Sequence, residues 1–250
     1  MLYKVEGIVI RSMDYGEGHK IISIYTRESG KMSVMARGAK KLKSRHGAIT
    51  QLFTYGQFVV YKSSQMGTLN AGEIIDSHHK LREDLMKSAY AAYIAEMTEK
   101  LTGELEPSPM LFEQILAAFK GIEEDKAPFA IAHMMEMKML ILSGYAPELD
   151  QCVACGRAAG EMSFSVSGGG LLCTNCRSRD PQAIGIGPGT LKLLRLFRQI
   201  DLRRLGQIEM KPLTQVQLKQ VMRGLMDAYL DARWKSRSFL DQMDKHGFTE

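Results

Sequence analysis

The first 77 residues alternate between short apolar runs and turn residues. Runs of this kind that are rich in Val, Ile, Tyr and Phe are typical of β-strands. The pattern predicts five strands, at Tyr3 to Arg11, Lys20 to Thr26, Lys31 to Arg37, Gln51 to Lys62 and Thr68 to Ile75. Five short strands with one long connection, residues 37–50, favour a five-stranded OB-fold barrel. An SH3-like barrel remains the alternative.

After Ser77, which with Asp76 can serve as a helix N-cap, the apolar period changes from two to 3.6. The first predicted helix carries an apolar residue at every fourth position, with Leu81, Leu85, Ala89, Tyr93, Met97 and Leu101 in one stripe. Further helices are predicted at Met110 to Lys120, Phe129 to Ser143, Thr190 to Leu202 and Thr214 to Trp234. The predicted fold is therefore α+β and multidomain, with an OB-fold domain over residues 1–78 and an all-α domain over residues 79–250.

All four cysteines fall in two pairs, Cys152 with Cys155 and Cys173 with Cys176, and seventeen residues separate the pairs. Each pair can hold two thiolates on one tight turn, and the segment MSFSVSGGGLL between them can form a hairpin. Two disulfides or a thioredoxin-type redox pair are the alternatives. The spacing favours one structural Zn²⁺ per chain, held by all four thiolates in a module over residues 148–180 that interrupts the helical domain. Such a site leaves no position open for substrate.

Positive charge is concentrated near the N-terminus. The chain carries 33 Lys and Arg against 28 Asp and Glu, and residues 1–80 hold 12 basic and 6 acidic side chains, which is the whole excess. The segment from Lys31 to Arg45 contains no carboxylate. Its candidate nucleic-acid-binding residues are Lys31, Arg37, Lys40, Lys41, Lys43 and Arg45. A run of this kind attracts a polyanion, and nucleic acid is the leading candidate.

Single-stranded nucleic acid also needs aromatic rings on which bases stack. The predicted fourth strand offers Phe53, Tyr55 and Tyr61 on one face and Phe58 on the other. One face must fill the barrel, so at most some of these rings are available for stacking.

Composition and motifs exclude several classes of protein. With 45% hydrophobic and 24% charged residues, the chain has the composition of a folded protein in water. The start of the chain does not resemble a signal peptide and no long apolar run occurs, so we expect a cytoplasmic, nucleoid-associated protein. No phosphate-binding loop or catalytic triad spacing is found, which predicts a protein that is not an enzyme.

Several phrases together resemble the bacterial DNA repair and recombination mediator family RecO. They are EGIVIRSMDYGE, RGAKKLKSR, LREDLMKSAYAAY, GYAPELDQCVACG and SRSFL, and they span the whole chain. The resemblance implies binding of single- and double-stranded DNA, annealing of complementary strands, and cooperation with RecR to load RecA onto DNA coated by single-strand-binding protein. It places DNA on Arg37, Lys40, Lys41, Lys43 and Arg45 and metal on Cys152, Cys155, Cys173 and Cys176.

The resemblance also suggests that the helical domain captures the acidic tail of single-strand-binding protein. We expect the methionine-rich helix over residues 129–143 to form part of the groove for that tail. The alternative function is a nucleic-acid-modifying enzyme that uses the OB and zinc modules for substrate binding. ATPase and nuclease assays discriminate between these two functions.

Overall fold

The computed structural model describes residues 1–62 and 65–245. Contacts group the chain into two compact units, Met1–Pro128 together with the segment that starts at Trp234, and Phe129–Arg233. The domain boundaries that the sequence predicts at residues 78, 148 and 180 stay predictions. The two units are described separately below.

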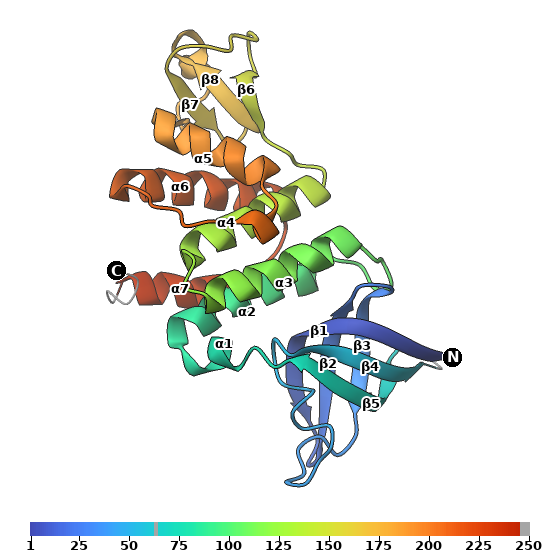
Figure 1. Cartoon of the computed structure of the whole chain (residues 1–250). Helices are drawn as coiled ribbons and strands as arrows, with labels where there is room; N and C mark the ends of the chain where they lie inside the picture. The colour runs from blue at the N-terminus through green and yellow to red at the C-terminus, as the bar shows by residue number, and fades with distance from the viewer. Residues whose placement is uncertain (63–64, 246–250) are drawn as a thin grey trace. The chain divides into compact units, whose positions relative to one another are not determined.

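The N-terminal part of the first unit is a closed β-barrel (Figure 1). Its strands are β1 (Leu2–Tyr15), β2 (His19–Thr26), β3 (Gly30–Ala36), β4 (Tyr55–Lys62) and β5 (Gly67–Asp76), in the spatial order β1-β2-β3-β5-β4. All neighbours are antiparallel except β3 and β5, which pair in parallel through Val34 with Gly67 and Met35 with Thr68. This topology is that of an OB-fold, which confirms the predicted fold and excludes the SH3-like alternative.

The barrel interior follows the alternation of the sequence, because successive side chains of a strand point to opposite faces. Its core consists of twelve buried residues, Val5, Val9, Ile22, Ile24, Met32, Val34, Ala36, Ala39, Ile49, Phe58, Val60 and Leu69. Two of these, Ala39 and Ile49, come from the connection between β3 and β4 and not from a strand. That connection is therefore packed onto the barrel.

Two predicted strand boundaries were wrong. β1 continues four residues past Arg11 to Tyr15, and β4 begins at Tyr55, not at Gln51. The later start has a local cause, since Phe53 has a φ of 72°, a left-handed conformation that interrupts an extended chain. The long connection therefore runs over residues 37–54.

In the described part of the first unit, four helices follow the barrel, α1 (His79–Glu83), α2 (Leu85–Leu101), α3 (Pro109–Glu123) and α7 (Lys235–Lys245). The single helix predicted through Leu81 and Leu101 is in fact two, because Asp84 is extended and its carboxylate accepts a hydrogen bond from the Lys87 amide at 2.8 Å. Leu85, expected in the apolar stripe, is exposed at 57%. The N-cap of α1 is His78, not Asp76 or Ser77.

The junction between the barrel and α3 depends on a glycine. Gly30 has a φ of 65°, and a Cβ there would lie 2.4 Å from the carbonyl oxygen of Glu106. Lys31 continues this contact, since its carbonyl accepts a hydrogen bond from the Leu105 amide at 3.1 Å. The loop between α2 and α3 is thus fixed against the start of β3. Ser108 then caps α3 by accepting from the Leu111 amide.

The second unit is helical with a small sheet. It contains α4 (Pro128–Leu142), α5 (Pro188–Gln199) and α6 (Pro212–Tyr229), with short 3-10 helices η1 (Thr174–Arg179) and η2 (Leu202–Arg204). Four short strands lie between α4 and α5 in the order β6-β8-β7-β9. Their bounds are β6 Glu148–Cys152, β7 Met162–Ser165, β8 Gly170–Cys173 and β9 Ile184–Gly185. The antiparallel pair β7 and β8 confirms the predicted hairpin.

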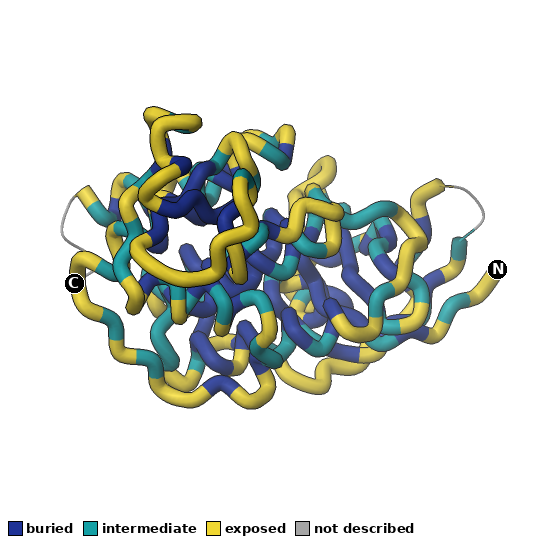
Figure 2. Tube along the Cα trace, turned by 90° about the horizontal axis from the view of Figure 1, so that it is seen from above, coloured by how far each residue is buried: buried dark blue, intermediate teal, exposed yellow. Residues whose placement is uncertain are grey.

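Buried and exposed residues are interspersed along the chain trace (Figure 2), and two predictions in the helices were wrong, one about burial and one about a helix end. In α4, Met134, Met135, Met137 and Met139 are all at most 1% exposed, so the expected methionine groove is wrong. The helix predicted to reach Trp234 ends at Tyr229, where Leu230 becomes extended. The Trp234 ring instead packs edge-on against Tyr93, with 6.2 Å between ring centroids.

Candidate nucleic-acid interface and cysteine cluster

The basic connection between β3 and β4, which we call the basic loop (residues 37–54), is anchored at its middle. Ile49 is 2% exposed and packs so closely on the barrel that a Cβ on Gly56 would lie 2.8 Å from its Cδ1. The Thr50 hydroxyl donates to the His46 carbonyl at 2.8 Å. The charged part of the loop therefore projects from a fixed base.

Four predicted DNA contacts gather on the exposed part of this loop. Arg37, Lys41, Lys43 and Arg45 are all exposed. Leu42, between two of them, is fully exposed. None of these four cations has a carboxylate within salt-bridge distance among the described residues. Their charge is therefore available to an anionic ligand.

Lys40 differs from its neighbours because its ammonium lies 2.7 Å from a carboxylate oxygen of Asp14. The hydrogen bond from Lys40 holds the pKa of Asp14 below its usual range. Asp14 is the last residue but one of β1, beyond the predicted end of that strand. The structure therefore partly neutralises one of the predicted contacts.

Lys31 is not brought together with the loop. It lies at the opposite end of β3, about 20 Å of extended chain from Arg37 at roughly 3.3 Å per residue. Its ammonium donates to the backbone carbonyl of Glu99 at 2.5 Å. This side chain fastens the barrel to α2 in the described fold.

The turn between β1 and β2 lies beside the basic loop, which the sequence did not indicate. The Gly38 amide donates to His19 Nδ1 at 3.0 Å, and the Lys40 amide donates to the Gly18 carbonyl at 3.2 Å. Tyr15, paired with His19 across the turn, is 53% exposed. An aromatic ring thus stands at the same end of the barrel as the loop cations. Its signal was hidden because β1 was expected to end at Arg11.

The predicted aromatic face of the fourth strand does not form. Phe53 is fully buried in the turn before β4, edge-on to Phe119 with 5.3 Å between centroids. Phe58 fills the barrel core. Tyr55 hydrogen-bonds Glu6, and burial together with that carboxylate raises the pKa of Tyr55 to about 12. Only Tyr61, 53% exposed, keeps a ring in solvent.

The four cysteines form a cluster in the second unit. Cys152 ends β6, Cys173 ends β8, and Cys155 and Cys176 follow on the adjoining turns. Their sulfur atoms all lie within 4.8 Å of one another. Cys155 is exposed, and the other three are buried. The structure therefore brings together all four of the predicted ligands.

The turn that carries the first pair is built around Gly156, whose φ is 74°. Its amide donates to the Cys152 carbonyl at 2.9 Å, and the Cys152 amide donates to the Arg157 carbonyl at 2.8 Å. Burial raises the pKa of the Cys152 thiol. Hydrogen bonds from the amides of Cys173, Ala154 and Cys155 have the larger combined effect and lower this pKa to about 6. A thiolate is thus favoured at this corner of the cluster.

The donor set fits a tetrahedral Zn²⁺. Four sulfurs at about 2.3 Å from one metal would lie about 3.8 Å apart. The Cys155 and Cys173 sulfurs are 3.7 Å apart, and all four cysteines are free of disulfides. A disulfide requires about 2.05 Å. The cluster can therefore hold a metal as a closed four-sulfur site.

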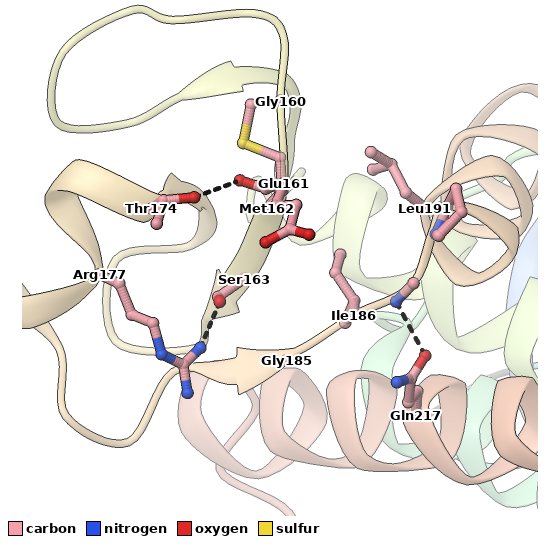
Figure 3. Close-up of a pocket in the computed structure, with 12 residues that line it drawn as sticks. Gly160, Glu161, Met162, Ser163, Thr174, Arg177, Gly185, Ile186, Leu191 and Gln217 are labelled. Atoms are coloured by element: carbon pink, nitrogen blue, oxygen red, sulfur yellow. Dashed lines mark hydrogen bonds between the residues drawn. The ribbon is translucent and has the colours of Figure 1, made fainter.

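A pocket of about 910 Å³ adjoins the cysteine module (Figure 3). One wall comes from β7 and η1, where the Arg177 guanidinium donates to the Ser163 hydroxyl. The other comes from the start of α5 and from α6, where Gln217 accepts from the Gly187 amide at 3.0 Å. Because Arg177 directly follows Cys176, the cysteine cluster fixes this wall.

The basic stripe of α5 serves the fold of the second unit. Arg195 donates to the Leu149 carbonyl at 2.8 Å, and Arg198 forms a 2.8 Å ion pair with Asp150. Both contacts are with β6, the strand whose last residue is Cys152. Lys192 is exposed. The helix therefore braces the strand that ends at Cys152.

Within the described ranges, no helix is long and apolar enough to cross a membrane. Comparison with known proteins bears on the role of the two sites. Residues 1–78 match the family model described as Recombination protein O N terminal, and residues 82–238 match Recombination protein O C terminal.

Full-length relatives agree with both matches. The chain is 48% identical to the DNA repair protein RecO of Bacillus subtilis over 244 residues, which cover 98% of this chain and 96% of the relative. It is 46% identical to that of Bacillus pumilus, with 98% and 95% coverage. It is 44% identical to that of Halalkalibacterium halodurans, with 99% and 98% coverage. The chain therefore belongs to the RecO family of DNA repair and recombination proteins.

Proposed function

We propose that this protein is a recombination mediator without catalytic activity, which binds single- and double-stranded DNA and anneals complementary strands. With RecR, it would help to load RecA onto DNA coated by single-strand-binding protein. Membership of the RecO family supports the role in repair and recombination. The observation that carries the DNA-binding step is the group of exposed, unpaired cations on the anchored basic loop.

Electrostatics links this loop to annealing. Two complementary strands repel each other, and each carries condensed counterions that a bound cation displaces. Arg37, Lys41, Lys43 and Arg45 supply such cations at one end of the barrel. Because Ile49 anchors the loop, little chain entropy is lost when DNA binds. A protein that neutralises both strands lowers the barrier to their encounter.

Base stacking would supplement these phosphate contacts. Tyr15 is exposed beside the loop cations, and a tyrosine ring stacks on any base. Tyr61 is also exposed, but it lies near the end of β4 that is farther along the strand from the basic loop, which joins β4 at Tyr55. We therefore assign stacking to Tyr15 first.

The cysteine cluster would hold one structural Zn²⁺ per chain through Cys152, Cys155, Cys173 and Cys176. When bound, the metal ties the turn after β6 to the turn after β8, and no coordination position is left for a substrate. The four ligands and the 3.7 Å sulfur separation support this assignment. Its role would be to hold β6, β8 and the adjoining pocket wall.

Partner assignment rests on the family. RecR and DNA would bind the barrel, and the acidic tail of single-strand-binding protein would bind the helical part of the chain. The tail cannot use a methionine surface on α4, because those methionines are buried. The protein would act in the cytoplasm at the nucleoid.

Annealing of complementary strands tests the DNA-binding step. The double variant Lys41→Ala with Lys43→Ala should slow annealing and bind many DNA sequences more weakly, because phosphate contacts carry little base information. The dependence of log affinity for single strands on log salt should become about 1.4 units shallower, at about 0.7 per lost contact.

A matched control removes two exposed lysines outside the barrel, Lys120→Ala with Lys192→Ala. This control has the same net charge as the test variant and should retain the salt dependence. If both double variants lose affinity equally, net charge alone explains binding and the loop has no special role. Coated strands with and without RecR then test the mediator step.

A further inference from the structure

A second cluster of metal-binding groups lies in the first unit, away from the cysteines and the basic loop. Asp76 is the last residue of β5, His78 is the N-cap of α1, and Glu123 is the last residue of α3. A carboxylate oxygen of each acid and a ring nitrogen of the histidine lie within 4.8 Å of one another. Segments 45 residues apart in the chain therefore meet at one point.

The histidine ring nitrogen Nδ1 is at the centre of this cluster. It lies 2.9 Å from Oε2 of Glu123 and 3.8 Å from Oδ2 of Asp76. Asp76 is oriented by the His78 amide, which donates to its other carboxylate oxygen at 2.9 Å. The side chains of His78 and Glu123 are 4% and 14% exposed, whereas that of Asp76 is 53% exposed. Solvent thus reaches the cluster on the Asp76 side.

A proton alone satisfies this arrangement poorly. One N–H at Nδ1 can donate well to only one of the two carboxylates that face it. The other ring nitrogen, Nε2, is buried and has no hydrogen-bond partner in the described structure. A cation held at Nδ1, by contrast, can contact both carboxylates at once, because an oxygen of each lies within 4.8 Å of the ring nitrogen. A neutral ring leaves two carboxylate charges beside it.

Nearby cations do not occupy the space between the ligand atoms. The Arg82 guanidinium donates to the backbone carbonyls of Leu52 and Ser77. The Lys87 ammonium donates to the Glu123 carbonyl and pairs with Asp125 at 2.7 Å. Both make the local potential less negative, yet in the described structure neither forms an ion pair with the carboxylate of Asp76 or Glu123.

We propose that Asp76, His78 and Glu123 bind one divalent transition-metal cation, of the Mn²⁺ or Zn²⁺ class. A neutral imidazole with two carboxylates is a donor set that such ions accept, whereas four thiolates select softer ions. Zn²⁺ would thus suit both this site and the cysteine cluster, whereas Mn²⁺ would suit only this site. Bound metal would connect the last strand of the barrel to the end of α3.

Mn²⁺ is the probe of choice for two reasons. It is paramagnetic, and its low rank among divalent metals means that it should not displace Zn²⁺ from the cysteines. The zinc-loaded full chain is titrated with Mn²⁺, and free Mn²⁺ is measured by electron paramagnetic resonance. We expect one saturable site per chain. Glu123→Gln should weaken it at least tenfold, since even outer partners of metal ligands change affinity by 10- to 100-fold.

The matched control is Glu124→Gln. Glu124 is the next residue, is exposed, and pairs with Lys126 at 2.8 Å. It carries the same charge but lies outside the cluster, so its loss should leave Mn²⁺ affinity within about twofold. Equal weakening by both substitutions would overturn the proposal, as would the absence of saturable binding up to millimolar Mn²⁺.

A second measurement does not depend on whether the Glu123 variant folds. Mn²⁺ should raise the Tm of the unsubstituted protein in a concentration-dependent way, because a ligand that binds only the folded state stabilises it. Mg²⁺ at the same concentration should raise it less, since it disfavours imidazole ligands. An equal rise with both ions would show charge screening and not a site, and would also overturn the proposal.

Discussion

The carboxylate of Glu96, in the middle of α2, accepts a hydrogen bond from the backbone amide of Ser236 at 2.8 Å. It also accepts from the Lys235 amide at 3.0 Å and from the Ser236 hydroxyl. These donors are the free N–H groups at the start of α7. A residue 140 positions earlier in the chain therefore caps this helix.

This cap predicts a specific loss of stability. Glu96→Ala should lower the free energy of unfolding by about 1 to 2 kcal/mol, as the loss of other helix N-caps does. The control Glu99→Ala removes a more exposed ion pair with Arg11 on the same helix, and should cost less than about 1 kcal/mol. Urea denaturation measures both. Similar losses in the two variants would show that the cap contributes nothing special.

The effect of Glu96 should depend on pH. Burial raises the pKa of Glu96, but hydrogen bonds from Lys100 and Ser236 lower it more, so the pKa falls below its ordinary value of 4.5. A carboxylate whose pKa is depressed by folding stabilises the folded state fully above its ordinary pKa. That contribution is lost as pH falls through the folded-state value. The difference between the unsubstituted protein and Glu96→Ala should therefore shrink below about pH 4, and a difference that grows there would contradict this.

The pairing of Lys40 with Asp14 predicts an unusual gain of function. Asp14→Asn should release the Lys40 ammonium and strengthen DNA binding, with a steeper dependence on salt. Lys40→Ala should weaken binding less than Lys41→Ala, because only Lys41 is unpaired. Fluorescence anisotropy at several salt concentrations measures these changes. The control Glu17→Gln removes an exposed acid from the neighbouring turn, and it should have the smaller effect.

The stacking role of Tyr15 is tested on single-stranded DNA. Tyr15→Ala should cost about 1 to 3 kcal/mol of binding free energy, and Tyr15→Phe should retain most of it, because the ring face makes the contact. Tyr61→Ala serves as the matched control, since Tyr61 has the same exposure. Equal losses for the two alanine variants would remove the assignment to Tyr15.

Metal content tests the cysteine cluster. Protein purified without chelator should contain about one Zn²⁺ per chain, and Cys155→Ser or Cys173→Ser should release it. Proteolysis of residues 148–180 should accelerate in both variants while the barrel stays folded. Asn175→Ala, an exposed neighbour that is not a ligand, should keep its zinc. Full occupancy in both serine variants would refute the four-thiolate site.

The elements that the sequence predicted well are those whose signal is local. Alternation identified all five barrel strands, and the spacing of Cys152, Cys155, Cys173 and Cys176 identified a cluster that the structure assembles. Helix α7 was missed because only Leu240 and Met243 are buried on it, so it has almost no apolar stripe. Its stability depends on the distant Glu96, which no local pattern reveals.

The site residues show the same division. Lys31 and Arg37 are close in sequence, yet an extended strand separates residues six positions apart by about 20 Å. The pairing of Lys40 with Asp14 and the meeting of His78 with Glu123 both join segments that are distant in the chain. These relationships require the closed barrel and the packed helices, so they could not be predicted from spacing.

The short parallel pairing of β3 with β5 has a mechanical consequence. Among the residues that the structure describes, only Val34 with Gly67 and Met35 with Thr68 close the barrel there, whereas β4 pairs with β5 along most of its length. A cylinder with one short seam opens along that seam at the lowest cost. We therefore expect amide protons in this pairing to exchange through local opening before those in the other four pairings do. The pairing of β3 with β5 is thus the place where we expect the barrel wall to separate first.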